Sequence, residues 1–265
     1  LGYIYGGIRL SLLCGLGFLA LALFNLWDNA MLTLALIIIC VPFCVATGLL
    51  IGILGFFNPR LNQRLITPAL DLMQTMPTFA YLIPMLLLFG ASPVSALLAT
   101  GFFATPPMVR ATILGLTKVP SEIADFADMA GCTKRQKLWR VLIPSAKPSL
   151  MIGVNQVIML ALNMVIISSM IGAGGLGYDV LLALRALKVG QAMEAGLAIV
   201  VIAIVLDRLS QSVARKGPDT RAATTLWQRH GNLIIILSIL ATTTLLSLFI
   251  PALAKLPKDA TLTTT

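Results

Sequence analysis

Long apolar blocks, separated by short polar segments, dominate the chain and predict membrane-spanning helices. A helix needs about 20 apolar residues to cross a hydrocarbon core of ~30 Å. Blocks of roughly this length or more cover 10–27, 29–59, 148–178 and 231–254, and a shorter uncharged block reaches it with its flanks at 191–210. Because transmembrane β-barrels alternate apolar and polar residues instead, this pattern predicts an all-α polytopic membrane protein.

One further block, 72–109, is uncharged throughout and is too long for a single crossing. It contains the sequence Gly90-Ala91-Ser92-Pro93, whose small residues and proline are typical of a turn. We therefore expect a helical hairpin here, which supplies the third and fourth spans. Together with the other blocks, this hairpin predicts about seven transmembrane helices.

The charges support this interpretation and orient the chain. Charged residues make up only 11% of the 265 residues and hydrophobic residues 58%, whereas soluble domains are about 25% charged. The net charge is +9, with 19 Lys and Arg residues. With seven spans, all but four of these bases fall on one side of the membrane, which marks the cytoplasmic face. The four exceptions are Arg185, Lys188, Lys255 and Lys258.

This asymmetry places the N-terminus and the loop 112–147 in the cytoplasm, and the loop 172–194 and the C-terminus outside. We therefore expect a multi-pass protein of the inner (cytoplasmic) membrane, with lipid bilayer around its apolar faces. Since the basic residues serve to orient the chain, they do not indicate a nucleic-acid partner.

Few side chains are suited to catalysis or metal binding. Cys40 and Cys44 share a helix face, but the other two cysteines lie elsewhere and the chain has one histidine. We predict that these two cysteines pack in the core and bind no metal. The sequence contains no nucleophile–base set and no P-loop. We therefore expect no catalytic residue and no cofactor in this chain, which predicts that it is not an enzyme.

The cytoplasmic loop 118–147 combines an acidic first half with a basic second half. Ser121 is a suitable N-cap for a short helix, and Gly131 is suited to end it. Thr133 and Gln136 then form a capping-box pattern for a second short helix. We expect the second helix to stop before the next span.

Proline at position 144 is the expected stop signal of that second helix. The first helix carries an apolar face that needs a cover, and its residues are Ile123, Phe126, Ala127 and Ala130. The cover is either the protein's own helix ends, the lipid headgroup layer, or a groove on a cytoplasmic partner. The spacing alone leaves these alternatives open.

The same loop resembles a motif of inner-membrane permeases of ABC importers, which has the form E-A-A-x3-G-x9-I-x-L-P. The matching residues are Asp125-Phe126-Ala127, Gly131 and Val141-Leu142-Ile143-Pro144. In that family the loop is the coupling helix that docks on a separate ATP-hydrolysing subunit. The resemblance implies that coupling to the ATPase rests on Glu122, Asp125, Phe126, Ala127, Gly131, Ile143 and Pro144.

Three further stretches, at 73–84, 170–178 and 203–211, are similar to permeases for glycine betaine, proline betaine, choline and related compounds. The resemblance covers roughly 30–213 and implies the type I ABC importer permease fold. It also implies a homodimer, ATP and Mg on partner ATPase subunits, and a periplasmic or extracellular substrate-binding protein. The alternatives are an ABC permease for another small solute, such as phosphonate or methionine, and an ion-coupled secondary transporter.

The domain organisation follows from the extent of this resemblance. Residues 1–29 form an N-terminal transmembrane helix, and 30–213 form the permease core with its coupling loop at 118–147. Residues 214–265 form a C-terminal extension with the seventh span, and the sequence predicts no role for it.

Prolines 77 and 84 interrupt the third span, where broken backbone is tolerated if it lines a wet cavity or is buried in protein. Soft and aromatic side chains flank the break and would suit a methylated ammonium. The predicted pathway residues are Met73, Gln74, Thr75, Met76, Pro77, Thr78, Phe79 and Tyr81. The alternative is helix packing, with the hydroxyls bonded back to the chain.

A glycine-rich segment follows the fifth span. Its glycines are Gly172, Gly174, Gly175 and Gly177. The segment follows no strand and lies outside by the charge distribution, so it does not predict a phosphate site. We expect these glycines to allow close backbone approach to a neighbouring helix, and the resemblance implies that they lie near the outer gate.

Overall fold

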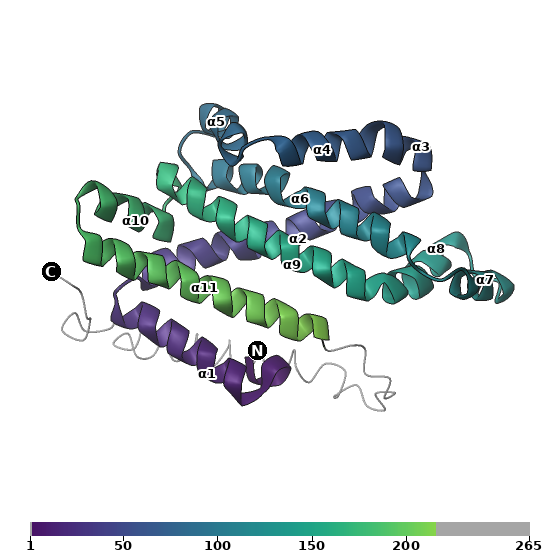
Figure 1. The fold of residues 1–265 in the computed structure, drawn as a ribbon, viewed down its shortest axis with the longest axis horizontal. Helices are drawn as coiled ribbons and strands as arrows, with labels where there is room; N and C mark the ends of the chain where they lie inside the picture. The colour runs from purple at the N-terminus through teal and green to yellow at the C-terminus, as the bar shows by residue number, and fades with distance from the viewer. Residues whose placement is uncertain (1, 216–265) are drawn as a thin grey trace, which may run out of the picture.

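The computed structural model describes residues 2–215 as an array of helices (Figure 1). The α-helices are α1 (Gly2–Leu23), α2 (Trp27–Phe57), α3 (Pro59–Leu61), α4 (Thr67–Thr75), α5 (Thr78–Phe89), α6 (Pro93–Thr117), α7 (Ser121–Met129), α8 (Lys134–Gln136), α9 (Ile143–Ser168), α10 (Leu176–Arg185) and α11 (Val189–Arg215). Three π-helical segments join them: η1 (Asn62–Ile66), η2 (Lys137–Leu142) and η3 (Ser169–Ala173). The seventh span predicted at 231–254 lies outside the described residues.

Among the described residues, four helices are long and apolar enough to cross a membrane. They are Trp27–Phe57, Pro93–Thr117, Lys134–Gly172 and Val189–Ser212. A fifth candidate is the pair Pro59–Thr75 and Thr78–Phe89, which is bent by 92° at a short break. The predicted class of all-α polytopic membrane protein is confirmed, with four to five candidate spans, and the total of seven stays a prediction.

The central helix is α6, which packs against both α2 and α9; α2 crosses behind the other two in the view of Figure 1. Buried side chains of these three helices form one apolar cluster, which includes Cys44, Met108 and Val157. The thiols of Cys40 and Cys44 lie 3.6 Å apart and unbridged, and both residues are buried against α6. The prediction that these cysteines pack in the core is confirmed.

Glycines bring the three central helices close together. A Cβ atom added at Gly52 of α2 would lie 2.5 Å from Cβ of Thr112 on α6. A Cβ at Gly153 of α9 would lie 2.6 Å from Cβ of Ala111, which is also on α6. Small residues let helix backbones approach in membranes, where dispersion contacts largely replace the hydrophobic effect. The α2–α6–α9 layer is therefore fixed by the absence of side chains at these positions.

The predicted hairpin turn is present between α5 and α6. Gly90 has a φ of 69° at the end of α5, a left-handed conformation that glycine adopts without strain. Ser92 then caps α6 with a capping box: its hydroxyl accepts from the backbone N–H of Ser95, and the Ser95 hydroxyl accepts from the N–H of Ser92. The turn therefore reverses the chain where the small residues predict it.

The two prolines of the third span behave differently. Met76 and Pro77 are extended, with ψ of 134° and 149°, and separate α4 from α5. The ring of Pro77 disfavours helical geometry for the residue before it, which explains the break at Met76. Pro84 was also expected to weaken the helix, yet α5 continues through it. Tyr81 and Leu82, one turn earlier, are buried, and their packing holds that turn.

The loop 118–147 forms the predicted pair of short helices, with one shift at its start. Pro120 occupies the N-cap of α7, and Ser121 is the first helical residue and makes no capping bond, so the predicted cap was wrong by one position. Pro120 is extended, with a ψ of 139°, and the helix begins directly after it. No side chain at the N-cap accepts a hydrogen bond from the first turn of the helix. Gly131, with a φ of 74°, ends the turn after α7, and the Cys132 N–H donates to the Ala127 carbonyl. Together with the bond from the Gly131 N–H to the Asp128 carbonyl, this bond forms a Schellman motif.

The second helix of the loop does not stop where predicted. The Thr133–Gln136 capping box is present, but the helix then runs from Lys134 to Gly172 without a break. In the π-helical turn η2 the Ile143 N–H donates to the Leu138 carbonyl. Pro144 directly follows this π-helical turn, which accommodates the proline inside the continuous helix, so the prediction that it ends the helix was wrong.

Candidate functional site

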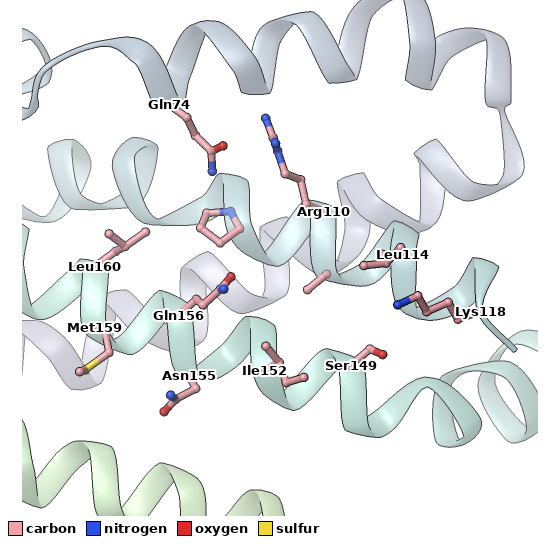
Figure 2. A pocket seen from close by; sticks show the side chains of 12 residues that line it. Gln74, Arg110, Leu114, Lys118, Ser149, Ile152, Asn155, Gln156, Met159 and Leu160 are labelled. Atoms are coloured by element: carbon pink, nitrogen blue, oxygen red, sulfur yellow. The ribbon is translucent and has the colours of Figure 1, made fainter.

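A cavity of about 630 Å³ lies between α4, α6 and α9 (Figure 2). Its wall combines polar and apolar side chains from all three helices. The lining residues are Gln74, Pro107, Arg110, Ala111, Leu114, Lys118, Ser149, Ile152, Asn155, Gln156, Met159 and Leu160. Because the cavity falls in the usual size range of small-molecule sites, it is large enough for a compact solute.

The electrostatics of this cavity are set by Arg110. Its guanidinium forms an ion pair with Asp71 of α4, and both side chains are about half exposed. Lys118 lies at the end of α6 and also lines the cavity, whereas none of the lining residues is acidic or aromatic. The wall is therefore positively charged and offers hydrogen-bond donors, with apolar surface on α9.

Asn155 adds a polar group that finds no partner within the part of the chain that the structure describes. Its Oδ1 atom is buried and makes no hydrogen bond there. A buried carbonyl oxygen without a donor costs about 1–3 kcal/mol. Asn155 is one of the lining residues, but this oxygen is itself buried and does not face the open space of the cavity.

The predicted pathway residues are distributed over the bend of the third span and do not share one surface. Gln74 lines the cavity described above, and Met73 lines a second, apolar cavity of about 380 Å³ between α2, α4 and α6. The Thr75 hydroxyl donates to the Leu72 carbonyl at 2.9 Å, as the packing alternative predicts. The other members near the break are exposed or half-buried: Met76, Pro77, Thr78 and Phe79.

Tyr81 stabilises the bend and does not line either cavity. In a continuous helix the Met73 carbonyl would accept from the N–H of residue 77, but Pro77 has no N–H. The buried Tyr81 hydroxyl donates to this carbonyl instead. The ring of Tyr81 also packs edge-on against Phe103 of α6, with centroids 6.1 Å apart. Tyr81 therefore holds the broken span together and ties it to the central helix.

The glycine-rich segment packs closely against α2 and α9, as predicted. A Cβ at Gly175 would lie 2.6 Å from the Thr33 hydroxyl, and the Leu176 N–H donates to that hydroxyl at 3.1 Å. A Cβ at Gly177 would lie 2.4 Å from the Ile166 carbonyl oxygen. Both positions therefore require glycine if the segment is to keep this approach.

Two more glycines of the segment have left-handed backbone conformations. Gly172 has a φ of 115° and approaches Ala91 of the hairpin turn, while Gly174 has a φ of 76° and approaches Leu32. The helix that follows carries Asp179, whose carboxylate accepts a hydrogen bond of 2.6 Å from Asn29 of α2. Burial raises the pKa of Asp179, and the bond from Asn29 offsets part of this rise.

The loop predicted to couple to an ATPase presents an uncovered apolar surface. The predicted face divides: Ala127 is buried inside the protein, whereas Ile123 and Phe126 point outward and are 38% and 69% exposed. Met129, which the predicted face did not include, is 81% exposed beside them. Lys137 of η2 forms an ion pair of 2.6 Å with Asp128 of α7. The loop thus has an ordered inner side and an apolar outer side.

The remaining coupling residues take different positions. Glu122, Asp125 and Pro144 are exposed, and Ile143 packs partly buried against the central cluster. Figure 1 shows α7 and α8 at one end of the molecule and α10 at the other. The predicted coupling loop and the glycine-rich segment therefore lie far apart, at opposite ends of the long helices.

Sequence reasoning missed the main charged residue of the cavity. Arg110 was counted only among the bases that mark the cytoplasmic face, but it lies within α6, two turns before its end. Asn155 and Gln156 were not singled out either, although they are adjacent polar residues inside the apolar block 148–178. Polar residues inside a predicted span were the signal that could have identified this wall.

The fold is that of a transporter subunit of known structure. The structure of the MetNI methionine ABC transporter in an inward-facing conformation includes a chain that matches this one with a TM-score of 0.64. The match covers 70% of this chain and 92% of the other, at 18% identity. A second crystal form of the same transporter matches with a TM-score of 0.60. The arrangement of helices in this chain is therefore that of the matched chain.

The family follows from the sequence. Residues 45–216 match the model of the binding-protein-dependent transport system inner membrane component, and the chain belongs to this family. As a member of it, the chain is an inner-membrane, multi-pass permease component and is not itself an enzyme.

Several relatives have described transport functions. The chain is 42% identical over 234 residues to the trimethylamine N-oxide transport system permease protein TmoV of Pelagibacter ubique, covering 88% of this chain and 32% of that protein. It is 43% identical over 209 residues to the glycine betaine/proline betaine permease ProW of Escherichia coli, covering 79% and 59%. The chain thus spans about a third to three-fifths of the length of these relatives.

Proposed function

We propose that this chain is the permease of an ATP-driven importer for a quaternary amine or a related methylated osmolyte. The observation that carries the proposal is the uncovered outer face of α7, formed by Ile123, Phe126 and Met129. Exposed, contiguous apolar side chains on a soluble segment indicate a protein or membrane interaction site. The acidic residues beside this face would be repelled by anionic lipid headgroups, so a protein partner suits it better than the membrane surface.

The partner on this face is a cytoplasmic ATPase subunit that binds ATP and Mg. The loop contributes Glu122, Asp125, Phe126, Ala127 and Gly131, and the start of the next helix contributes Ile143 and Pro144. Its short helices are tied together by the Lys137–Asp128 ion pair, and η2 continues directly into the fifth span. A movement of the ATPase would therefore reach the membrane-spanning helix through a continuous helical connection.

The substrate class rests on the relatives. Their names specify transport of trimethylamine N-oxide, of glycine betaine and proline betaine, and of glycine betaine. All three are small molecules with a methylated nitrogen. A separate or fused binding protein outside the membrane would select the solute, and the permease would pass it inward.

The pathway runs beside the bend of the third span and between two copies of this chain. The bend exposes Met76 and Phe79 and places Gln74 and Met73 at two cavities. Glycines 172, 174, 175 and 177 at the opposite end of the molecule form the outer gate. With α7 in the cytoplasm, the N-terminus of the chain is cytoplasmic too.

The coupling assignment is tested with Phe126→Asp. A buried aspartate would oppose docking, so the ATPase should no longer co-purify with the permease, while membrane insertion should be unchanged. Recovery of the ATPase on a tagged permease measures the first effect, and the amount of permease in the membrane fraction measures the second.

Phe126→Leu is the matched control, because it keeps the residue apolar and should retain most of the bound ATPase. If Phe126→Asp also retains a full complement of ATPase, the assignment of α7 as the docking helix is wrong.

A further inference from the structure

The cavity between α4, α6 and α9 has a composition that does not suit a bare cation. Recognition of a quaternary ammonium by cation–π contact needs aromatic faces, and none of the lining residues is aromatic. Nor is any of them acidic, while Arg110 and Lys118 contribute positive charge. Asp71 is ion-paired with Arg110 and balances one of these charges, so the wall as a whole stays positive.

The donors of the cavity are arranged for an anionic group. Figure 2 shows the side chains of Gln74 and Arg110 extending toward one another from α4 and α6. The guanidinium has five N–H donors, and the ion pair with Asp71 uses Nη2. Arginine is well suited to bind a carboxylate through two parallel bonds, and the amide of Gln74 supplies another donor.

The part of the wall on α9 adds apolar side chains, beside the polar Ser149, Asn155 and Gln156. Ile152, Met159 and Leu160 line it. Methionine is polarizable and adapts its shape, which suits the rounded surface of a trimethylammonium group. The cavity therefore combines a donor-rich, positive side with a soft apolar side.

We propose that this cavity is a substrate site that binds zwitterions by their anionic end. Arg110 and Gln74 bind the carboxylate or N-oxide oxygen, and Ile152, Met159 and Leu160 cover the methylated nitrogen. The permease itself then discriminates zwitterionic osmolytes from free cations such as choline. This inference rests on the proposed function and adds a selective step in the membrane to the selection made by the binding protein.

The test uses the complete importer in proteoliposomes, with the permease, its ATPase and its binding protein at saturation. ATP-dependent uptake is measured for two probes, glycine betaine as the zwitterion and choline as the cation. In Arg110→Gln, we expect uptake of glycine betaine to fall about tenfold or more, since a charge-assisted bidentate interaction is lost. Uptake of choline, relative to glycine betaine, should rise.

Two variants separate substrate binding from a structural role of the ion pair. Asp71→Asn removes the same ion pair but leaves the guanidinium in place, so uptake of glycine betaine should be retained or increased. Arg208→Gln, an exposed arginine on α11 away from the cavity, controls for loss of a basic residue. Assembly of each variant is checked by size-exclusion chromatography of the whole complex.

If Arg110→Gln does not assemble, Gln74→Leu tests the same side of the cavity and should shift the ratio in the same direction. The inference is overturned if Asp71→Asn and Arg110→Gln lose uptake equally, or if the ratio of the two probes does not change. A wild-type importer that transports neither probe with ATP would instead contradict the proposed function.

Discussion

The two sides of α6 differ in how completely this chain covers them. On the side of α2 and α9, glycines allow backbone contact, and Met108 of α6 is fully buried. On the side of α4 and α5, the helices are broken and much of their surface is open, with Leu87 of α5 83% exposed. The first side of α6 is covered by helices of the same chain, whereas the surface on the second side needs lipid or another protein chain to cover it.

This difference reflects the residues that each side contains. The α2 face repeats small residues at helical spacing, including Gly48 and Gly52, and α6 faces them with Met108 and Thr112. The third span instead combines prolines with bulky apolar side chains, which cannot approach α6 as closely. The closed side thus provides a fixed frame, and the open side provides the surfaces on which transport would depend.

The largest effect should come from breaking the closed side at Gly52. In Gly52→Ala the new Cβ would meet Cβ of Thr112 at 2.5 Å, so α2 and α6 must separate. Overpacking of this kind costs typically 1–3 kcal/mol, so the free energy of unfolding should fall by about this amount. Denaturation of the purified protein in detergent, followed by circular dichroism, measures it.

Gly196→Ala on α11 is the matched control for this substitution. A Cβ at Gly196 meets nothing within 4 Å, and alanine favours helix over glycine. This variant should be as stable as the wild type or slightly more stable. Equal destabilisation by both substitutions would contradict the distinction between a closed and an open environment.

A smaller effect is expected on the open side, from Tyr81→Phe. The ring and its contact with Phe103 remain, but the Met73 carbonyl loses the hydroxyl that replaces the missing N–H of Pro77. A buried acceptor without a donor costs about 1–3 kcal/mol; because the bend is partly exposed, we expect the lower end. The change in unfolding free energy is measured as for Gly52.

A double-mutant cycle with Pro77→Ala sharpens this prediction. Alanine restores an N–H at position 77, so the Met73 carbonyl no longer depends on Tyr81. Tyr81→Phe should then cost less in the Pro77→Ala background than in the wild type. The same cost in both backgrounds would mean that the hydroxyl does not compensate for the proline.

The sequence predicted features that depend on short-range chemistry. The turn at Gly90 and the capping box of Thr133 and Gln136 follow from what these residues do to their own backbone. Apolar block length likewise predicted the helices that are long and apolar enough to cross a membrane. Each of these signals is contained within a few residues of the feature that it predicts.

Features that depend on distant residues were not predictable in this way. Pro77 breaks a helix, but Pro84 and Pro144 do not, because buried neighbours or a π-helical turn compensate for them. Arg110 lies on the wall of a cavity only because α4 brings Gln74 and Asp71 opposite it. The same amino acid therefore has different roles, which tertiary contacts decide.

The smallest expected effect concerns the polar pair that joins α10 to the closed frame. Burial raises the pKa of Asp179 above its ordinary value of 3.8, so ionisation is unfavourable in the folded state. The stabilising contribution of this group is present below that value and is lost as the pH rises through the folded pKa. Asp179→Asn keeps an oxygen that accepts from Asn29 but removes the charge. At about pH 7 the variant should therefore be slightly more stable, by less than about 1 kcal/mol because the group is only partly buried. This advantage should vanish toward acidic pH.

Melting temperatures at several pH values measure the effect. Asp28→Asn, which removes an exposed carboxyl at the start of α2, is the control for loss of a charge. A variant less stable than the wild type at about pH 7 would show that the carboxylate, through its bond to Asn29, holds the glycine-rich segment in place.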